Sequence, residues 1–179
     1  DEHVALVCPP GNAGAGMFQT AIFAWSLVGF SNVYTGIAQR AYDLAVQQLP
    51  RKSSLRMTRS MAYHPELQHE VAEMRIALEA TTAYLDSVGN DWSEGVDHGG
   101  EWPIKLVAVK HFAIHQAWTV VDTALQLSGG GGIFRRNRME QLFRDARLGR
   151  FHPANSAFAH ELIGKLSLGI DPDEQPRWG

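Results

Sequence analysis

Four consecutive glycines, Gly129 to Gly132, are the feature that most constrains how this chain folds. Each glycine loses more backbone entropy on folding than any other residue, so the run cannot simply continue the apolar helix predicted before it. The bare N–H groups of such a run can approach an anion or a dinucleotide closely, which is the usual use of a glycine cluster. The alternative is a flexible turn that leads into a solvated helix, and glycine motifs alone do not separate the two.

An arginine-rich stretch follows the glycines, and it contains only two acids, Glu140 and Asp145. The net charge of the chain is -3, which argues against nucleic-acid binding. The local excess of positive charge therefore favours a small anion or the carboxylates of a partner. Its arginines are Arg135, Arg136, Arg138, Arg144, Arg147 and Arg150.

Length and composition are those of one soluble globular domain: 179 residues, 45% of them apolar and 20% charged. The single cysteine, Cys8, excludes a disulfide framework and a four-cysteine zinc site, and it suits a reducing compartment. No secretory signal pattern is evident, and no apolar run reaches the roughly 18 residues that cross a bilayer. We therefore expect a cytoplasmic protein without a membrane span.

Hydrophobic spacing predicts two long helices in the first half of the chain. The first covers about 14–49 and ends at Pro50, and small residues along it predict the close approach of another helix. The second runs from Pro65 to Val88 and stops at Gly89. The first helix has its apolar stripe at Phe18, Ile22, Trp25, Gly29, Val33, Gly36, Arg40 and Leu44; the second has a seam at Leu67, Val71, Met74, Leu78, Thr81, Leu85 and Val88, and another stripe at Ile76, Ala80 and Ala83.

Three further helices are predicted, at about 103–127, 138–148 and 153–168. Apolar residues surround the 103–127 helix almost completely, so it is expected to be central. The predicted fold class is all-α, an up-and-down four-helix-type bundle of long antiparallel helices with a short C-terminal helix. Residues 1–8 look like a stray N-terminal strand, which needs a sheet to join. We therefore expect 1–13 to be the last strand and linker of an upstream β-domain, and 14–179 to be the helical bundle.

Metal and hydrolytic sites are poorly supported by the residue pattern. Glu66 and His69 have the Glu-x-x-His spacing of di-iron bundles, but the chain lacks a second copy of that motif. His111 and His115 lie one helical turn apart, yet no third ligand is spaced with them, so a surface or interface pair is the simpler interpretation. No Gly-x-Ser-x-Gly motif marks a serine nucleophile. We predict no metal site.

The order of several motifs resembles the C-terminal helical domain of the acyl-CoA dehydrogenase family. Lys110 is followed by Gln126, then by Gly129-Gly130-x-Gly132, then by the helix start 140–146, which reads Glu-x-Leu-x-Arg-Asp-Ala. Upstream, 36–41 (Gly-Ile-Ala-Gln-Arg-Ala) is similar to the first long helix of that domain. The resemblance covers essentially residues 1–168.

This resemblance implies a flavoprotein that α,β-dehydrogenates acyl-CoA thioesters with FAD. It implies a homo-oligomer, dimer or tetramer, or a heteromeric partner from the same family. This chain alone, which lacks the family's β-domain, is expected to be inactive. The residues that the resemblance assigns to the FAD, most of them to that of a neighbouring subunit, are Arg51, Gln126, Gly129, Gly130, Gly132 and Asn155.

The family's catalytic base is the motif that this chain lacks. In most members a glutamate stands seven residues beyond Arg-Asp-Ala, and here that position is Pro153. The alternative position on the first long helix corresponds to about Trp25, beside Ser26. Proline has no side chain that accepts a proton, so the resemblance leaves three explanations: a non-catalytic assembly subunit, a relocated base or an unusual substrate.

Two residues are the nearest candidates for a relocated base, Glu161 and His152. For Glu161 the alternative is a surface carboxylate paired with Lys165 at i+4. For His152 the alternative is a loop residue that caps the last helix. The sequence does not identify the base, the acyl chain or the choice between homo- and hetero-oligomer.

Overall fold

The computed structural model describes residues 17–54 and 58–175. The strand predicted at 1–8 lies outside these residues. Across the described ranges the secondary structure is helical, without a strand, which confirms the all-α prediction. The helices are α1 (Met17–Gln48), α2 (Pro65–Ser93), α3 (Trp102–Ser128), α4 (Arg138–Leu148) and α5 (Ser156–Ser167), with short 3₁₀ turns η1 (Leu49–Arg51), η2 (Met61–Tyr63), η3 (Gly99–Glu101), η4 (Gly129–Ile133) and η5 (Gly149–Phe151).

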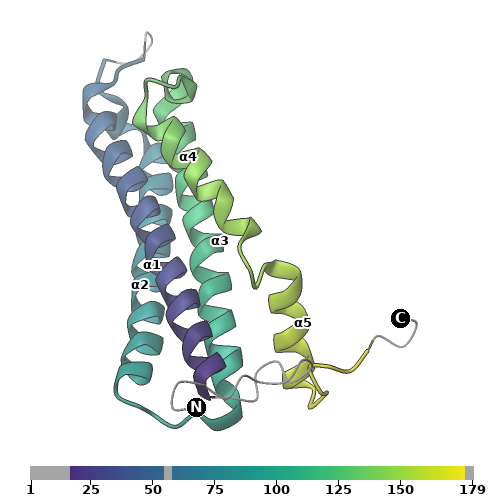
Figure 1. The fold of residues 1–179 in the computed structure, drawn as a ribbon. Coiled ribbons are helices and arrows are strands. Elements are labelled where there is room, and N and C mark those ends of the chain that lie inside the picture. Colours follow the sequence, from purple (N-terminus) through teal and green to yellow (C-terminus); the bar gives the residue numbers. More distant parts are fainter. Residues whose placement is uncertain (1–16, 55–57, 176–179) are drawn as a thin grey trace, which may run out of the picture.

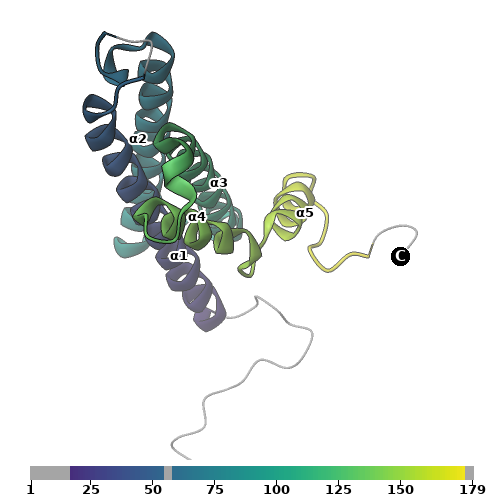
Figure 2. The same ribbon diagram turned by 90° about the horizontal axis from the view of Figure 1, so that it is seen from above.

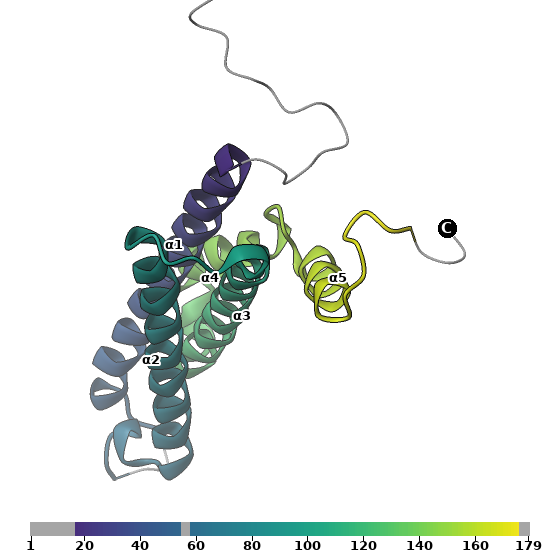
Figure 3. The same cartoon turned by 90° about the horizontal axis from the view of Figure 1, so that it is seen from below.

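The three long helices lie side by side and alternate in direction (Figure 1). α4 returns antiparallel along α3 and completes the up-and-down bundle, as predicted. α5 stands to one side, near the end of the bundle where α1 begins, and the views from above and below both show this separation (Figures 2 and 3). The opposite end of the bundle contains the connection between α1 and α2 and the glycine turn η4, because α1 and α3 run in the same direction.

α3 is the central helix, as its all-round apolar pattern predicts, and it contacts α1, α2, α4 and α5. Two clusters of buried side chains follow it. One, toward the glycine turn, includes Leu78, Val120 and Met139. The other, toward α5, includes Leu106 and Ala159. Burial of apolar area in these clusters is the main favourable term that holds the bundle together.

The predicted seam of α2 is correct, and its five residues from Met74 to Val88 that face inward are buried. The second stripe is wrong, since Ile76, Ala80 and Ala83 are exposed. The predicted end at Gly89 is also wrong, because α2 continues to Ser93.

The end of α2 is set by Gly95, which has φ +67, a conformation that glycine adopts without strain. The N–H of Gly95 bonds to Trp92 O at 3.3 Å, and that of Val96 bonds to Asp91 O at 2.9 Å. This pair of bonds is a Schellman motif, in which the glycine lies just past the last helical turn.

The stripe predicted to pack along α1 faces outward in this structure. Ile22, Trp25 and Val33 are 50%, 74% and 60% exposed, and a Cβ placed on Gly29 or Gly36 would meet no atom within 4 Å. The stripe was wrong as the inward face for most of its length, because α1 carries a second apolar stripe that lies inside the bundle. The predicted close approach of another helix is confirmed there, where Ala41 and Ala45, which lie beside the predicted stripe, are buried and α1 packs on α3. The buried residues of α1 are Ala24, Leu27, Ser31, Tyr34, Ala38, Ala41 and Ala45.

The segment Thr20–Arg51 is long and apolar enough, by length and composition, to cross a membrane. The expectation that no such run exists was therefore wrong. A helix packed in the core of a bundle passes the same test, and α1 packs on α3. Only 28% of its most apolar window is buried within this chain, so much of its apolar surface is left uncovered.

The last helix starts three residues later than predicted. Ala154 has φ 57, which breaks any helix begun at Pro153. Asn155 then caps α5 by accepting a hydrogen bond at its Oδ1 from Phe158 N, at 3.1 Å. Asn137 caps α4 in the same way, accepting from Met139 N at 3.0 Å. Local capping chemistry thus decides both helix starts.

Candidate functional site

The glycine turn η4 ends α3 and leaves its own backbone open. Gly129 has φ +64, which L side chains rarely adopt. A Cβ at Gly132 would lie 2.9 Å from Ser128 Cβ and 3.0 Å from Leu125 Cδ1, so this position has no room for one. Gly130 is exposed, and a Cβ there would meet nothing within 4 Å. The fold requires glycine at 129 and 132 but not at 130, whose bare backbone is open to a ligand.

Lys52 fastens the turn after α1 to the end of α3. Its ammonium donates to Ser128 O at 2.6 Å and to Leu127 O at 3.4 Å. These carbonyls are among the last of α3, which have no partner within the helix and carry the negative end of its dipole. Burial lowers the pKa of Lys52. Lys52, which follows Arg51 in the sequence, therefore caps the C-terminal end of α3.

A groove of about 460 Å³ lies beside this cap. It brings together Gln126 and Gly129, two of the residues assigned to the cofactor, with Lys52. Gln126 donates to Asp122 Oδ2 at 3.0 Å. Arg51 is exposed next to Lys52 and does not line the groove. The other lining residues are Met61, Glu66, Leu67, Glu70, Thr123, Leu127 and Ser128.

The carboxylates of Glu66 and Glu70 belong to this groove, and sequence reasoning missed that. The sequence pattern pointed to Glu66 only through its Glu-x-x-His spacing with His69, and in the structure it lies in the first turn of α2, where an acid favours the helix dipole. The spacing of four between the two glutamates places them on one face of α2, which was the available signal. The groove thus combines one cation, two carboxylates and an open glycine backbone.

The open backbone of this groove is compatible with part of FAD. The glycines permit close approach, and among the described residues Lys52 is the one cation that lines the groove, beside the carboxylates of Glu66 and Glu70. Gln126 offers an amide that both donates and accepts. These are the residues of this chain that would hold the cofactor.

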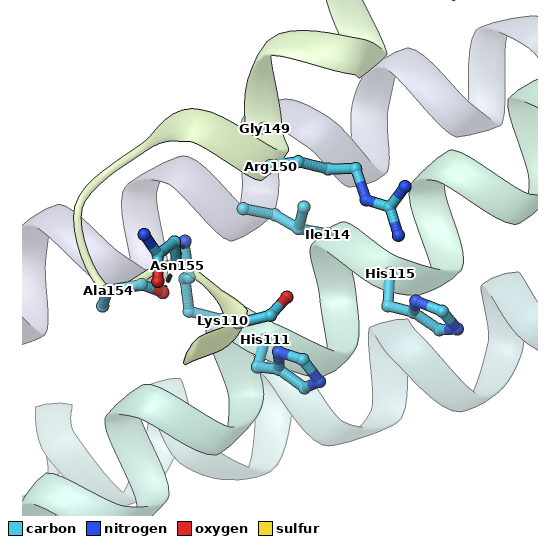
Figure 4. A pocket seen from close by; sticks show the side chains of 9 residues that line it. Lys110, His111, Ile114, His115, Gly149, Arg150, Ala154 and Asn155 are labelled. Carbon is cyan, nitrogen blue, oxygen red and sulfur yellow. Dashed lines mark hydrogen bonds between the residues drawn. The ribbon is translucent and has the colours of Figure 1, made fainter. Parts of the chain in front are cut away.

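A second, much smaller pocket lies at the loop between α4 and α5 (Figure 4). Gly149 allows the loop to approach the bundle, because a Cβ there would lie 2.9 Å from Ile114 Cγ2 and 3.0 Å from Tyr34 Cε1. Lys110 is only 2% exposed, and its Nζ donates to Ala154 O at 2.9 Å. This bond holds the strained residue that precedes α5. Burial lowers the pKa of Lys110.

Pro153, at the family's base position, is exposed, and the residue before it is better placed for chemistry. His152 Nε2 is 2.8 Å from the hydroxyl of Tyr34, and its ring stacks on Phe30 at 4.4 Å. Burial, and then the charge of Asp145, raise the pKa of Tyr34. The interpretation of His152 as a helix cap is wrong, because Asn155 performs that role.

Glu161 is on the exposed side of α5, where it forms an ion pair with Lys165 at 2.7 Å. Its side chain is 59% exposed, so it lacks the water-excluded surroundings expected of a catalytic glutamate. At the alternative base position, Trp25 is 74% exposed and Ser26 is exposed too. Neither the groove nor the pocket that Asn155 lines with Lys110 contains Glu161, Trp25 or Ser26.

Asn155 lies apart from the other residues assigned to the cofactor. It lines the small pocket with Lys110, whereas Gln126 and Gly129 line the groove. Lys110 and Ser128 mark these two places on α3, roughly 27 Å apart along the helix axis. Within this chain the assigned residues therefore form two groups.

A third histidine, which the sequence spacing did not reveal, joins His111 and His115. His160 of α5 lies with its ring centroid 4.7 Å from that of His111, while the rings of His111 and His115 are 6.4 Å apart and nearly parallel. Burial and the nearby His160, His115 and Lys110 lower the pKa of His111. In the described ranges no group of three or more His, Cys, Asp or Glu is arranged to hold a metal.

Comparison with known proteins identifies relatives over most of the chain. The family model described as "Acyl-CoA dehydrogenase, C-terminal domain" matches residues 28–157. The 3-sulfinopropanoyl-CoA desulfinase of Paraburkholderia xenovorans is 34% identical over 150 residues, which are 82% of this chain and 36% of that protein. This chain thus spans about a third of the length of the curated relatives it matches.

Solved structures share the fold at lower identity. XiaF from Streptomyces, determined in complex with FADH2 and glycerol, matches with a TM-score of 0.77 and 19% identity over 91% of this chain and 43% of its own. Butyryl-CoA dehydrogenase from Megasphaera elsdenii matches with a TM-score of 0.76 and 18% identity over 87% of this chain and 39% of its own. At these identities the structures support the fold alone.

Proposed function

Because this chain belongs to the acyl-CoA dehydrogenase C-terminal domain family, we propose that it is the helical domain of an FAD-dependent enzyme that α,β-dehydrogenates acyl-CoA thioesters. The observation that carries this proposal is the groove at the end of α3, where Gln126, Gly129 and Lys52 meet. The domain contributes part of the FAD site of a neighbouring subunit there. FAD, when bound, supplies the acceptor for the hydride.

Two observations on related proteins support the cofactor and substrate. XiaF was determined with FADH2. The desulfinase from Paraburkholderia xenovorans is named for a CoA thioester. In this chain a Cβ at Gly130 would meet no atom of the described residues within 4 Å, so packing does not explain why this residue is glycine. A glycine here leaves the backbone open to the close approach of a cofactor from outside the chain.

The apolar outer face of α1 supports the expected oligomer. Ile22, Trp25 and Val33 repeat at helical spacing on one face and are at least half exposed. Gly29 and Gly36 on the same face leave room for a helix of another subunit to approach closely. A dimer or tetramer with α1 at the interface would cover this surface.

Fluorescence of FAD during titration with the purified chain tests the proposed site. We expect saturable binding that Gln126→Ala weakens by about threefold or more, as loss of one hydrogen bond predicts. The control is Gln116→Ala, on the same helix roughly 15 Å away. Equal affinity of both variants, or no saturable binding, would contradict the groove as an FAD site.

Turnover provides a separate test. Because this chain spans about a third of its curated relatives, we expect no oxidation of acyl-CoA by the isolated chain with an artificial electron acceptor. A yellow and active preparation would contradict the proposal that the chain supplies only part of the catalytic unit.

The residue at the base position favours a second candidate function, a non-catalytic assembly subunit of a heteromeric acyl-CoA dehydrogenase. Pro153 cannot accept a proton, and Glu161 is already paired with Lys165. Composition of the complex from its native cell distinguishes the two functions. A stoichiometric second subunit of the same family supports the assembly role, whereas a fully active complex of one polypeptide excludes it.

If the enzyme does catalyse dehydrogenation, His152 is the side chain of this loop best placed to move a proton. It is half-buried, and its Nε2 is already engaged with the Tyr34 hydroxyl, which fixes the ring. We expect His152→Gln to lower kcat of the complete enzyme much more than Glu161→Gln does. The reverse ranking would assign the base to α5.

A further inference from the structure

The small pocket between α3, η5 and the start of α5 is surrounded by hydrogen-bond donors, most of them basic (Figure 4). α3 supplies Lys110, His111 and His115, and η5 supplies Arg150. The imidazoles of His111 and His115 project from the same side of α3, and the Arg150 side chain extends toward that side. The remaining lining residues are Ile114, Gly149, Ala154, Asn155 and Ser156.

Among the described residues, no carboxylate lines this pocket. Within the described ranges, Lys110, His111, His115 and Arg150 form no ion pair with an acid. The carboxylate adjacent in sequence to His160 is Glu161, which is occupied by Lys165. No carboxylate of the described residues therefore balances the charges of Lys110 and Arg150, and Arg150 has the ring of Trp118, 5.8 Å away, as its neighbour.

Lys110 makes this imbalance costly. It is 2% exposed, and in the described part of the chain its ammonium donates one hydrogen bond, to a neutral carbonyl. An ammonium has three donors, and a buried charge without a counter-charge is strongly destabilising. An anion at the mouth of the pocket would remove that cost.

The first residues of α5 add a further feature that favours negative charge. Asn155 and Ser156, at its N-terminus, line the pocket, and the first turn of this 12-residue helix contains no acid. The positive end of the helix dipole is thus open to an anion. His160, one turn on, extends the basic cluster to α5.

We propose that this pocket binds a phosphate-type oxyanion. The free space of about 20 Å³ admits little more than one water-sized group, so an oxyanion would place one oxygen inside, near Lys110. Arg150 and His115, both exposed, would hold its outer oxygens. The ligand is free phosphate or the phosphate of a phosphorylated small molecule. This site is separate from the proposed FAD groove: Lys110 lies roughly 27 Å along α3 from Ser128.

Titration of the purified chain with inorganic phosphate at constant pH and ionic strength tests the proposal. The signals to follow are the histidine ring protons in NMR spectra. We expect saturable shifts of His111 and His115, with sulfate producing similar shifts. Absence of saturable shifts at every phosphate concentration would overturn the proposal.

Matched arginine variants separate a built site from general surface charge. Arg150→Gln is expected to weaken phosphate binding about tenfold or more, because a charge-assisted hydrogen bond is lost. Arg135→Gln makes the same change of charge on an exposed arginine that does not line the pocket, and binding should stay within about twofold of wild type. Equal effects of the two variants would overturn the site.

Competition identifies the source of the oxyanion. Coenzyme A and FAD are each added to the phosphate-saturated chain, and the histidine signals are followed again. Displacement of phosphate by either compound at lower concentration than phosphate itself requires assigns the site to that phosphorylated ligand. Absence of competition assigns it to the free oxyanion. Because phosphate binding is measured without flavin, failure of the proposed function leaves this test intact.

Discussion

Two lysines donate to main-chain carbonyls: Lys52 donates to Ser128 at the end of α3, and Lys110, in the first half of α3, donates to Ala154. Burial lowers the pKa of both lysines. Their surroundings differ. Lys52 is partly exposed, reaches the negative end of a helix dipole and shares its groove with Glu66 and Glu70. Lys110 is buried beside histidines and an arginine. The same hydrogen bond thus belongs in one place to a site that contains carboxylates and in the other to a site that, among the described residues, contains none.

The comparison separates structural roles from binding roles. In the groove, the protein itself provides counter-charges and the open feature is neutral glycine backbone. In the small pocket, the protein provides cations and leaves the counter-charge to a ligand. The first three tests below compare a residue at the small pocket with a matched residue elsewhere in the chain.

The largest difference is expected from the lysines. Lys110→Ala should lower the free energy of unfolding by about 2–4 kcal/mol, because it leaves a cavity and an unsatisfied Ala154 carbonyl. Lys52→Ala should cost about 1 kcal/mol, since water can replace a partly exposed donor. Urea denaturation measures both. Equal costs would show that the two lysines are equivalent.

The glycines give the next largest contrast. Gly149→Ala should cost about 1–3 kcal/mol, because its Cβ would press on Ile114 and Tyr34. Gly130→Ala should change stability by less than about 0.5 kcal/mol, since its Cβ meets nothing. Thermal melts of the two variants check this. A destabilised Gly130→Ala would mean that η4 is under strain that its geometry does not reveal.

Replacement of either asparagine cap by alanine should lower the free energy of unfolding by about 1 kcal/mol. Asn137 caps α4 and Asn155 caps α5, so their stability effects are comparable. Only Asn155 lines the small pocket. Asn155→Asp keeps the cap and adds a carboxylate, and it should weaken phosphate binding while Asn137→Asp does not. Calorimetric titration with phosphate distinguishes them.

The smallest expected effect is on the pH dependence of stability. The pKa of His111 is lowered in the folded state, so the unfolded chain binds this proton more readily. Stability should therefore fall as pH drops through the ordinary value of 6.5 toward the lowered pKa. His111→Gln should flatten this part of the profile. An unchanged slope in His111→Gln would contradict the assigned cause.

The fold was largely predictable from the sequence because helix periodicity is a local property. Proline placed the start of α2 correctly at Pro65, the predicted bounds of α4 match, and the all-round apolar pattern identified α3 as central. The outward stripe of α1 was misassigned because periodicity shows that a face is apolar and not what covers it. The end of α2 was predicted at Gly89 for a related reason. A glycine ends a helix where the backbone takes the left-handed conformation, and in α2 this occurs at Gly95 and not at Gly89.

The candidate sites were predictable only in part. Gln126 and Gly129 are three residues apart, so their shared groove follows from local geometry. The pocket at Lys110 depends on contacts between residues far apart in sequence, 44 positions for Lys110 and Ala154. His160 joins His111 only because α5 folds back on α3. No spacing rule within one helix could reveal either contact.

The separation of α5 from the rest of the bundle has a consequence for cooperativity. α5 packs chiefly against α3, and the strained residue just before its cap is fastened by one lysine. An element with so few attachments can open while the long helices stay folded. The amide hydrogens of α5 would then exchange with solvent through local unfolding, at a lower free energy than the global unfolding of the three long helices requires.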